Sequence, residues 1–201
     1  MSEVVKLDPI KVRTIQVSIR GLSPLISHQF SEKARKQMRD KKLGQKVKNR
    51  EVADPEAEFE AATYRLSDGS FGVPATSIKN AMTEAAHKDL GLPRTVLRRG
   101  LFIIADDTPS GGVPLVRIRT PERIMREDVV RVGMGSSDLR WRPEFPKWEL
   151  DLRIQYDTEW LQVETIVGLL QRAGFGIGIG EWRPERDGDF GRFEIVKHAE
   201  E

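Results

Sequence analysis

Hydrophobic and polar side chains alternate most regularly from residue 148 to residue 156. The apolar members of this alternation are Trp148, Leu150, Leu152, Ile154 and Tyr156. A period of two places successive side chains on opposite faces, so this segment predicts a strand with one buried face. Residues 12–18 alternate in the same way, with one slip of register, and predict a second half-buried strand that ends at Gly21 and Pro24.

Two apolar segments between these strands predict a hairpin. Residues 101–105 form a continuous apolar run, which is typical of a central strand, and residues 115–119 alternate. The turn-forming residues 109–112 lie between them, so we expect the two strands to pair. A short extended piece at 71–74 and an apolar strand at 193–196 complete the predicted strands.

Helical periodicity is clearest after Thr76 and Ser77. Apolar residues then recur with the spacing of one buried helix face, and Gly91 and Pro93 end the helix. Because hydroxyl side chains accept hydrogen bonds from the free amides of a first helical turn, we expect Thr76 or Ser77 to be the N-cap.

Three further helices are predicted. One follows Asp157 or Thr158 as its N-cap and carries apolar residues as far as Ala173. A second starts with the sequence Asp-Pro-Glu and covers residues 54–64. A third, basic and with few large apolar residues, covers residues 31–44 from an N-cap at Ser31, and we expect it to project from the core.

The order of the main elements is strand, helix, strand, strand, helix, strand. This order is the ferredoxin-like (RRM-like) βαββαβ plan, so the sequence predicts an α+β fold. No linker rich in Pro, Ser or Gly divides the 201 residues. We therefore expect a single domain over residues 1–201, with insertions at about 28–70 and 106–145.

The amino-acid composition limits the kinds of metal, cofactor and disulfide chemistry that the protein can have. The chain has no cysteine, and its three histidines, at 28, 87 and 198, lie far apart in the sequence. Disulfides and thiolate metal sites are excluded, a zinc enzyme is disfavoured, and no cofactor is expected. The first residues lack a basic-then-apolar signal and no apolar run approaches membrane-spanning length, so we expect a cytoplasmic protein that does not contact membranes.

Charge is unevenly distributed along a chain whose net charge is only +2. Residues 31–50 contain nine basic and two acidic side chains, and residues 51–60 contain five acidic side chains before the next base. This pattern is consistent with a solvated helix pair, with electrostatic contacts between subunits, or with a nucleic-acid-binding arm. If it is an arm, the candidate contact residues are Lys36, Arg39 and Lys42.

The segment 174–192 (GFGIGIGEWRPERDGDFGR), here called the glycine loop, contains six glycines, four acidic residues and three arginines. Glycine is costly inside a helix or strand, so this density indicates a close backbone approach. The glycines fit neither G-x-x-x-x-G-K-[ST] nor G-x-G-x-x-G, and the segment follows a helix instead of opening one. A polymer backbone or another subunit is a better candidate partner than a mononucleotide.

Two segments resemble the RAMP superfamily of CRISPR effector proteins, in particular its repeated backbone subunits. Residues 73–82 (VPATSIKNAM) are similar to the segment that begins the family's first helix. The glycine loop is similar to the family's C-terminal glycine-rich loop and closes with the matching Phe-Gly-Arg at 190–192. Ala75 and Asn80 stand where the family prefers glycine, and residues 181–186 replace its basic and serine-containing centre, which indicates a distant relative.

The resemblance implies a non-catalytic subunit that binds single-stranded RNA and stacks head to tail into a filament or ribonucleoprotein complex. Its expected partners are single-stranded RNA or DNA, further copies of itself and other effector subunits. The helix start would meet a phosphate, the glycines would admit the strand, arginines would neutralise charge, and an indole would stack on bases. The residues in these roles are Thr76, Ser77, Lys79, Gly176, Gly178, Gly180, Trp182, Arg183, Arg186 and Arg192.

Simpler interpretations and two rival functions stay open. Ser77 and Lys79 are explained equally well as a helix cap and a solvated lysine, and Trp182 as a packing residue. Trp148 and Trp160 are expected in the core. Two rivals are a metal-independent RNA endonuclease with His28 as general base, and a structural or virus-associated protein that assembles without nucleic acid. The paired acids at 106–107 suit a metal-dependent nuclease but also an ordinary turn.

Overall fold

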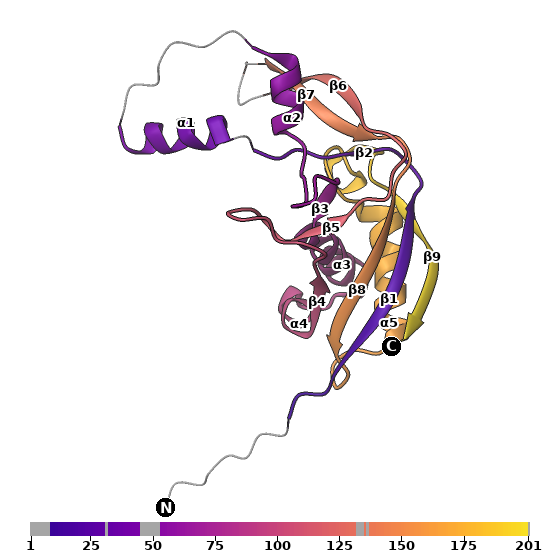
Figure 1. Cartoon of the computed structure of the whole chain (residues 1–201). Coiled ribbons are helices and arrows are strands. Elements are labelled where there is room, and N and C mark those ends of the chain that lie inside the picture. Colours follow the sequence, from indigo (N-terminus) through magenta and orange to yellow (C-terminus); the bar gives the residue numbers. More distant parts are fainter. Residues whose placement is uncertain (1–8, 31, 45–52, 132–134, 136, 201) are drawn as a thin grey trace, which may run out of the picture.

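The computed structural model describes residues 9–30, 32–44, 53–131, 135 and 137–200. Its largest sheet contains four strands in the order β4-β8-β1-β9, and all neighbouring strands are antiparallel. These strands are β1 (Val12–Gly21), β4 (Leu101–Ile104), β8 (Glu149–Asp157) and β9 (Phe193–Glu200). Helices α3 (Ala75–Leu90) and α5 (Val163–Arg172) pack against one face of the sheet (Figure 1). The predicted mixed fold with antiparallel strands is confirmed.

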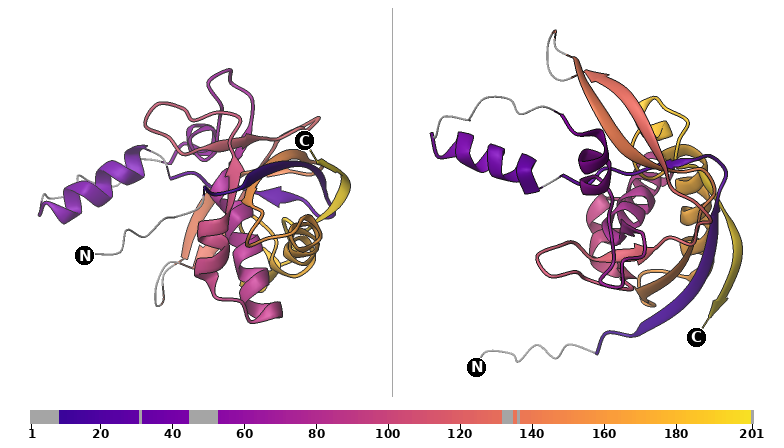
Figure 2. Two further views of the ribbon diagram at one scale, coloured as in Figure 1. Left: turned by 90° about the horizontal axis from the view of Figure 1, so that it is seen from below. Right: turned by 45° about the horizontal axis from the view of Figure 1, so that its top comes forward.

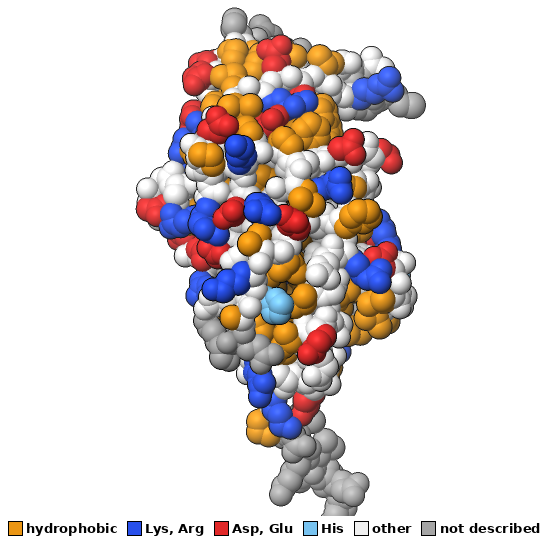
Figure 3. Space-filling model, turned by 90° about the vertical axis from the view of Figure 1, so that its right-hand side faces the viewer, with side chains coloured by type: hydrophobic (Ala, Val, Ile, Leu, Met, Phe, Trp, Pro, Cys, Tyr) orange, Lys and Arg blue, Asp and Glu red, His pale blue; other side chains and the backbone are white. Residues whose placement is uncertain are grey.

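The alternation in β1 and β8 decides which face of this sheet is covered. Every second residue, such as Val17 and Leu152, is buried against the helices in one continuous core. The residues between them face outward, where Ser18 Oγ donates to Asp151 at 2.6 Å. Basic and acidic side chains are interspersed over the side of the molecule shown in Figure 3. The period-two pattern of the sequence therefore determines which face of the large sheet is buried.

Two smaller sheets complete the strands. One has the order β2-β7-β6, with β2 (Leu25–Ile26), β6 (Ile124–Arg131) and β7 (Ser137–Phe145). The other pairs β3 (Gly72–Pro74) with β5 (Leu115–Arg117). The β6–β7 hairpin was not predicted from the sequence. Its strands carry ionisable side chains on the face that turns inward, so the hydrophobic alternation that marks a strand is absent.

The remaining helices are short or peripheral. They are α1 (Glu32–Lys42), α2 (Pro55–Ala61), α4 (Arg94–Gly100), a π-helical turn η1 (Ala173–Ile177) and a 3-10 turn η2 (Pro184–Arg186). Helix α1 stands away from the sheets in every view, as predicted (Figures 1 and 2). The expected N-cap at Ser31 lies outside the described residues. Within the described ranges, no helix is long and apolar enough to cross a membrane.

Helix starts differ from prediction in two of three cases. Asp54 caps α2 as expected, accepting from the amides of Glu56 and Ala57 at 3.1 Å. Helix α3 instead starts at Ala75, without a side-chain cap, because it continues directly from strand β3. Helix α5 starts at Val163 after Gln162. The predicted caps of these two helices therefore lie elsewhere. Thr76 and Ser77 lie within the first turn of α3, Asp157 is the last residue of β8, and Thr158 lies in the turn that follows β8.

The predicted hairpin of residues 101–105 with 115–119 is wrong. Strand β4 pairs with β8 at the edge of the large sheet, whereas β5 pairs with β3. The two segments meet only at the antiparallel bridge between Asp107 and Leu115, beside which the Asp106 carboxylate accepts the amide of Arg117 at 2.8 Å. Trp148 is buried as expected, but Trp160 is 47% exposed, with the Arg99 guanidinium 4.9 Å from its ring centre.

Replacing Gly21 with alanine tests the packing at the end of β1. A Cβ there would overlap the indole of Trp148, whose Nε1 donates to the Ser23 carbonyl at 2.9 Å. We expect Gly21→Ala to lower the free energy of unfolding by about 1–3 kcal/mol, measured by urea denaturation. Gly168→Ala is the matched control, because nothing lies within 4 Å of the added Cβ and helix α5 gains a better helix former. Equal effects of the two variants would show that the indole can move aside.

Candidate nucleic-acid interface

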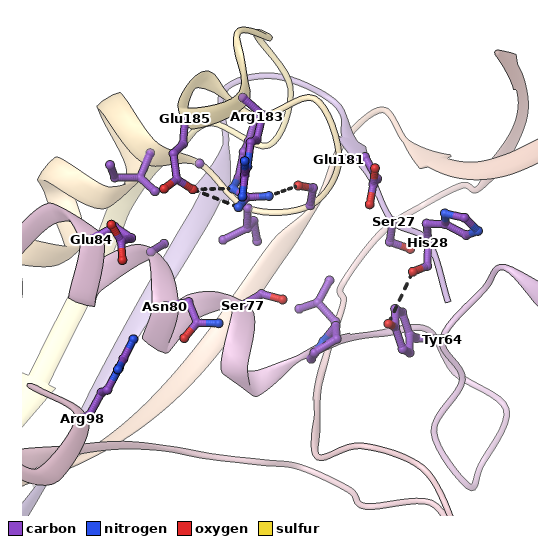
Figure 4. Close-up of a pocket in the computed structure, with 18 residues that line it drawn as sticks. Ser27, His28, Tyr64, Ser77, Asn80, Glu84, Arg98, Glu181, Arg183 and Glu185 are labelled. Carbon is purple, nitrogen blue, oxygen red and sulfur yellow. Dashed lines mark hydrogen bonds and ion pairs between the residues drawn. The ribbon is translucent and has the colours of Figure 1, made fainter. Parts of the chain in front are cut away.

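A groove of about 430 Å³ lies between helix α3 and the glycine loop. The α3 wall consists of Ser77, Asn80, Ala81 and Glu84, which share one helix face, and residues 177–181 with part of 183–186 form the facing wall. Ser27, His28 and Tyr64 line one end of the groove, and Arg98 lies toward the other (Figure 4). The fold therefore brings together the two segments that the sequence singled out, although they are far apart in the chain.

The glycines of this loop are needed mainly for contacts within the protein. Gly178 and Gly180 line the groove and have φ values of +71° and +79°, in the left-handed region that favours glycine. A Cβ on Gly180 would collide with the carbonyl oxygen of Ile26 in β2. Gly176 has open space around it and does not line the groove. The predicted close approach is thus made by the chain's own backbone at Gly180.

Arg183 is engaged by the loop itself. Its guanidinium donates to the Glu185 carboxylate at 2.9 and 3.1 Å and to the Gly180 carbonyl at 3.0 Å. Lys88 of α3 lies 3.3 Å from the same carboxylate. Burial by itself would raise the pKa of Glu185, but the hydrogen bonds from Arg183 and Lys88 hold that pKa below its usual value. Arg183 therefore bridges the loop to α3 through Glu185.

The groove also contains arginines that are available to a ligand. Arg186, a site residue expected from the sequence, and Arg98 both line it. Neither guanidinium forms an ion pair with any of the described residues. Arg98 belongs to a cluster of arginines just before β4, which the sequence alone allows either to line this face or to protect a strand edge.

Other predicted site residues point away from the groove. Lys79 Nζ donates to the Arg98 carbonyl at 2.9 Å and lies 3.9 Å from the ring centre of Phe102, and burial lowers its pKa. The Arg192 guanidinium lies 5.4 Å from the ring centre of Phe175. Thr76 is exposed but is not among the lining residues. Lys36, Arg39 and Lys42 are exposed on α1, apart from the groove-forming elements (Figure 2).

Trp182 packs over a buried ion cluster formed by Arg126, Asp128, Arg142 and Glu144 of the β6–β7 hairpin. Arg142 is 1% exposed, and its guanidinium lies 2.5 Å from Asp128 and 3.4 Å from Glu181 of the glycine loop. The indole of Trp182 lies 4.9 Å from that guanidinium. In this arrangement the half-buried Trp182 joins the loop to the hairpin, and its stacking on bases stays a prediction.

Of the residues proposed for nuclease chemistry, His28 lines the groove, whereas Asp106 and Asp107 do not. Asp106 and Asp107 accept hydrogen bonds from the amides of Arg117 and Ser67, so both carboxylates stabilise turns. Among the described residues, no three His, Asp or Glu side chains gather as a metal-binding set. His28 lines the groove, and burial lowers its pKa. Its carbonyl accepts from the Tyr64 hydroxyl at 3.4 Å, a neighbour that the sequence did not reveal.

Comparison with known proteins gives no family model that matches this sequence and no matching curated protein. Solved structures do match. A chain in the cryo-EM structure of the type III-B Cmr-beta bound to cognate target RNA aligns with a TM-score of 0.51 and 14% identity over 94% of this chain. The present chain therefore shares the fold of that Cmr-beta chain. The resemblance seen in the two motifs is confirmed at the level of the fold.

The match is partial in length. The chain spans 61% of the Cmr-beta subunit. Cmr6 from Pyrococcus furiosus also aligns, with a TM-score of 0.46 and 12% identity, over 94% of this chain and 100% of Cmr6.

Removing the buried guanidinium tests the link between hairpin and loop. We expect Arg142→Ala to lower the free energy of unfolding by about 3–5 kcal/mol, because Asp128 is then left buried without its closest cation. Arg140→Ala, on the same strand but 32% exposed and 3.6 Å from Asp138, is the matched control and should cost at most about 1 kcal/mol. Urea denaturation measures both. Equally small losses of unfolding free energy in both variants would mean that water reaches the ion cluster.

Proposed function

We propose that this chain is a RAMP-like backbone subunit that binds single-stranded nucleic acid, preferably RNA, in the groove between α3 and the glycine loop. The observation that carries the proposal is the meeting of the two motif segments across one groove. The similar Cmr-beta chain comes from a complex bound to cognate target RNA, which supports the choice of polymer.

The groove supplies the contacts that a nucleic-acid strand needs. Arg98 and Arg186 neutralise phosphates, which is the main sequence-independent source of affinity. Ser77 and Asn80 offer a hydroxyl and an amide from one face of α3 to the sugar-phosphate backbone. With Trp182 packed on the hairpin, contacts to the backbone would outweigh base stacking, so binding would depend little on sequence.

We also propose that residues 1–201 form a single domain around a ferredoxin-like βαββαβ core, with insertions at about 28–70 and 106–145. The strand order β4-β8-β1-β9 supports this assignment, as do the positions of α3 between β1 and β4 and of α5 between β8 and β9.

Assembly is part of the proposal. Copies of the chain would associate head to tail, alone or with other effector subunits, since a contact between two different surfaces of one protein repeats without closing. Helix α1 supports this because it stands apart and presents Lys36, Arg39 and Lys42, which suit a neighbouring acidic surface or the bound strand. We further propose a cytoplasmic, non-catalytic role without membrane contact.

Fluorescence anisotropy with single-stranded RNA, single-stranded DNA and duplex probes at two salt concentrations tests the proposal. Tight, salt-sensitive binding that prefers single strands is expected. Light scattering with and without RNA then tests assembly. Oligomers that form equally well without RNA, together with no binding to any probe, would favour the purely structural rival.

The two available arginines of the groove give a sharper test. We expect Arg98→Ala combined with Arg186→Ala to weaken RNA binding and to make the slope of log K against log salt shallower by about 1.4, which is about 0.7 for each phosphate that is no longer neutralised. A charge-matched control replaces Arg20 and Arg153, which lie on the outer face of the large sheet in β1 and β8. If both double variants change the slope equally, the groove is not the interface.

A second candidate function, a metal-independent RNA endonuclease, is favoured by one observation. His28 and Tyr64 lie together at one end of the groove, and burial lowers the pKa of the His28 imidazole, which favours the unprotonated form that a general base needs. Its ring is directed away from Ser77 and Asn80, however (Figure 4). If the chain is an endonuclease, a labelled hairpin RNA is cut in the presence of a metal chelator and His28→Ala abolishes the cut. Intact RNA with the native chain excludes this function for that substrate.

A further inference from the structure

The hydroxyl of Ser27 is a buried polar group without a partner. Ser27 lines the groove and is 4% exposed, and its Oγ has no hydrogen bond to any described residue. Nearly all buried polar groups in folded proteins are hydrogen-bonded, because removing them from water without a partner is unfavourable. An unpartnered hydroxyl at the wall of a groove therefore points to a group that joins it from the groove.

The backbone around Ser27 is firmly held. The Ser27 amide donates to the Pro143 carbonyl of β7 at 3.1 Å, and the Glu181 amide donates to the Ile26 carbonyl at 2.8 Å. These bonds fix Ser27 between the hairpin and the glycine loop, across the groove end from Ser77 in the first turn of α3 (Figure 4). We call the end of the groove lined by Ser27, Ser77 and Glu181 the hydroxyl niche. Main-chain contacts therefore set the positions of Ser27 and of the Glu181 backbone.

The charge of the niche argues against a phosphate. Glu181 brings a carboxylate that is 43% exposed on its side-chain atoms, and its nearest cation, Arg142, is 3.4 Å away on the side of the hairpin. His28, beside Ser27, carries little positive charge because burial lowers its pKa. Arg98 lies toward the opposite end of the groove (Figure 4). A phosphate would be repelled by Glu181, whereas a neutral hydroxyl can donate to it.

We propose that the hydroxyl niche binds the ribose 2′-hydroxyl of a nucleotide in the groove and so selects RNA over DNA. This inference rests on the proposed function and specifies its polymer. A 2′-hydroxyl both donates and accepts, so it can accept from Ser27 Oγ while donating to the Glu181 carboxylate. A deoxynucleotide leaves Ser27 without a partner, as in the free protein, and gains nothing at this position.

Binding of oligouridine and of oligo-2′-deoxyuridine of equal length tests the inference, because the two probes differ only in the 2′-hydroxyl. By fluorescence anisotropy, we expect the native chain to bind the RNA probe more tightly by about three- to tenfold, the value of a neutral hydrogen bond. Ser27→Ala should reduce this preference by weakening RNA binding, with DNA binding unchanged, because only the bond to Glu181 then remains. Ser110→Ala, an exposed serine that does not line the groove, should keep the native preference.

Thermal unfolding separates a ligand-binding role from a structural one. Because Ser27→Ala removes a buried hydroxyl that has no partner, its Tm should equal or exceed that of the native chain. A lower Tm with equal loss of affinity for both probes would overturn the inference. Equal binding of both probes by the native chain would also overturn it, and so would an undiminished preference for RNA in Ser27→Ala. Absence of binding to either probe would overturn the proposed function and the niche with it.

Discussion

The close contact between the glycine loop and strand β2 determines the geometry of the rest of the site. Gly180 adopts a left-handed conformation and lies so near the Ile26 carbonyl that no side chain fits between them. The amide of Glu181 closes the contact by donating to the same carbonyl at 2.8 Å, and the amide of Gly191 donates to the Pro24 carbonyl at 2.8 Å. The loop is thereby held at a fixed distance from α3, and that distance defines the groove. The hydroxyl niche and the packing of Trp182 on the hairpin both depend on where this contact places residues 181 and 182.

Most of the charge around the groove is neutralised within the protein. Arg183 and Lys88 are paired with Glu185, and Arg94 with Glu84 at 2.6 Å. Such pairs position side chains and raise specificity more than they add stability. This leaves few cations for a polyanion, in agreement with a net charge of only +2. Affinity in such a groove would come from a small number of well-placed contacts, which makes neutral donors and acceptors more important than in a strongly basic interface.

Periodicity was sufficient to predict the parts of the fold that bury one apolar face. Strands β1 and β8 and helix α3 follow their hydrophobic patterns closely, and the two motifs correctly marked both walls of the groove. The β6–β7 hairpin was missed because its inward side chains are ions that compensate one another across the strands, a pairing that no single segment reveals. The same limit applies to Lys79, which contacts the Arg98 carbonyl and the Phe102 ring in other elements of the fold. Ser27 carries no sequence signal at all, since an unpartnered hydroxyl is recognised only when its surroundings are known.

Glu181 connects the two unusual polar features of this structure. It lines the groove near Ser27, whose hydroxyl has no partner, and it lies 3.4 Å from Arg142, whose Nε is likewise buried without a partner. The longer contact to Glu181 and the shorter one of 2.5 Å to Asp128 show that Arg142 is held mainly by its own hairpin. The Glu181 carboxylate is consequently the less constrained member of the network and the one exposed to the groove. Any group that bonds to it from the groove acts on a residue already shared with the hairpin.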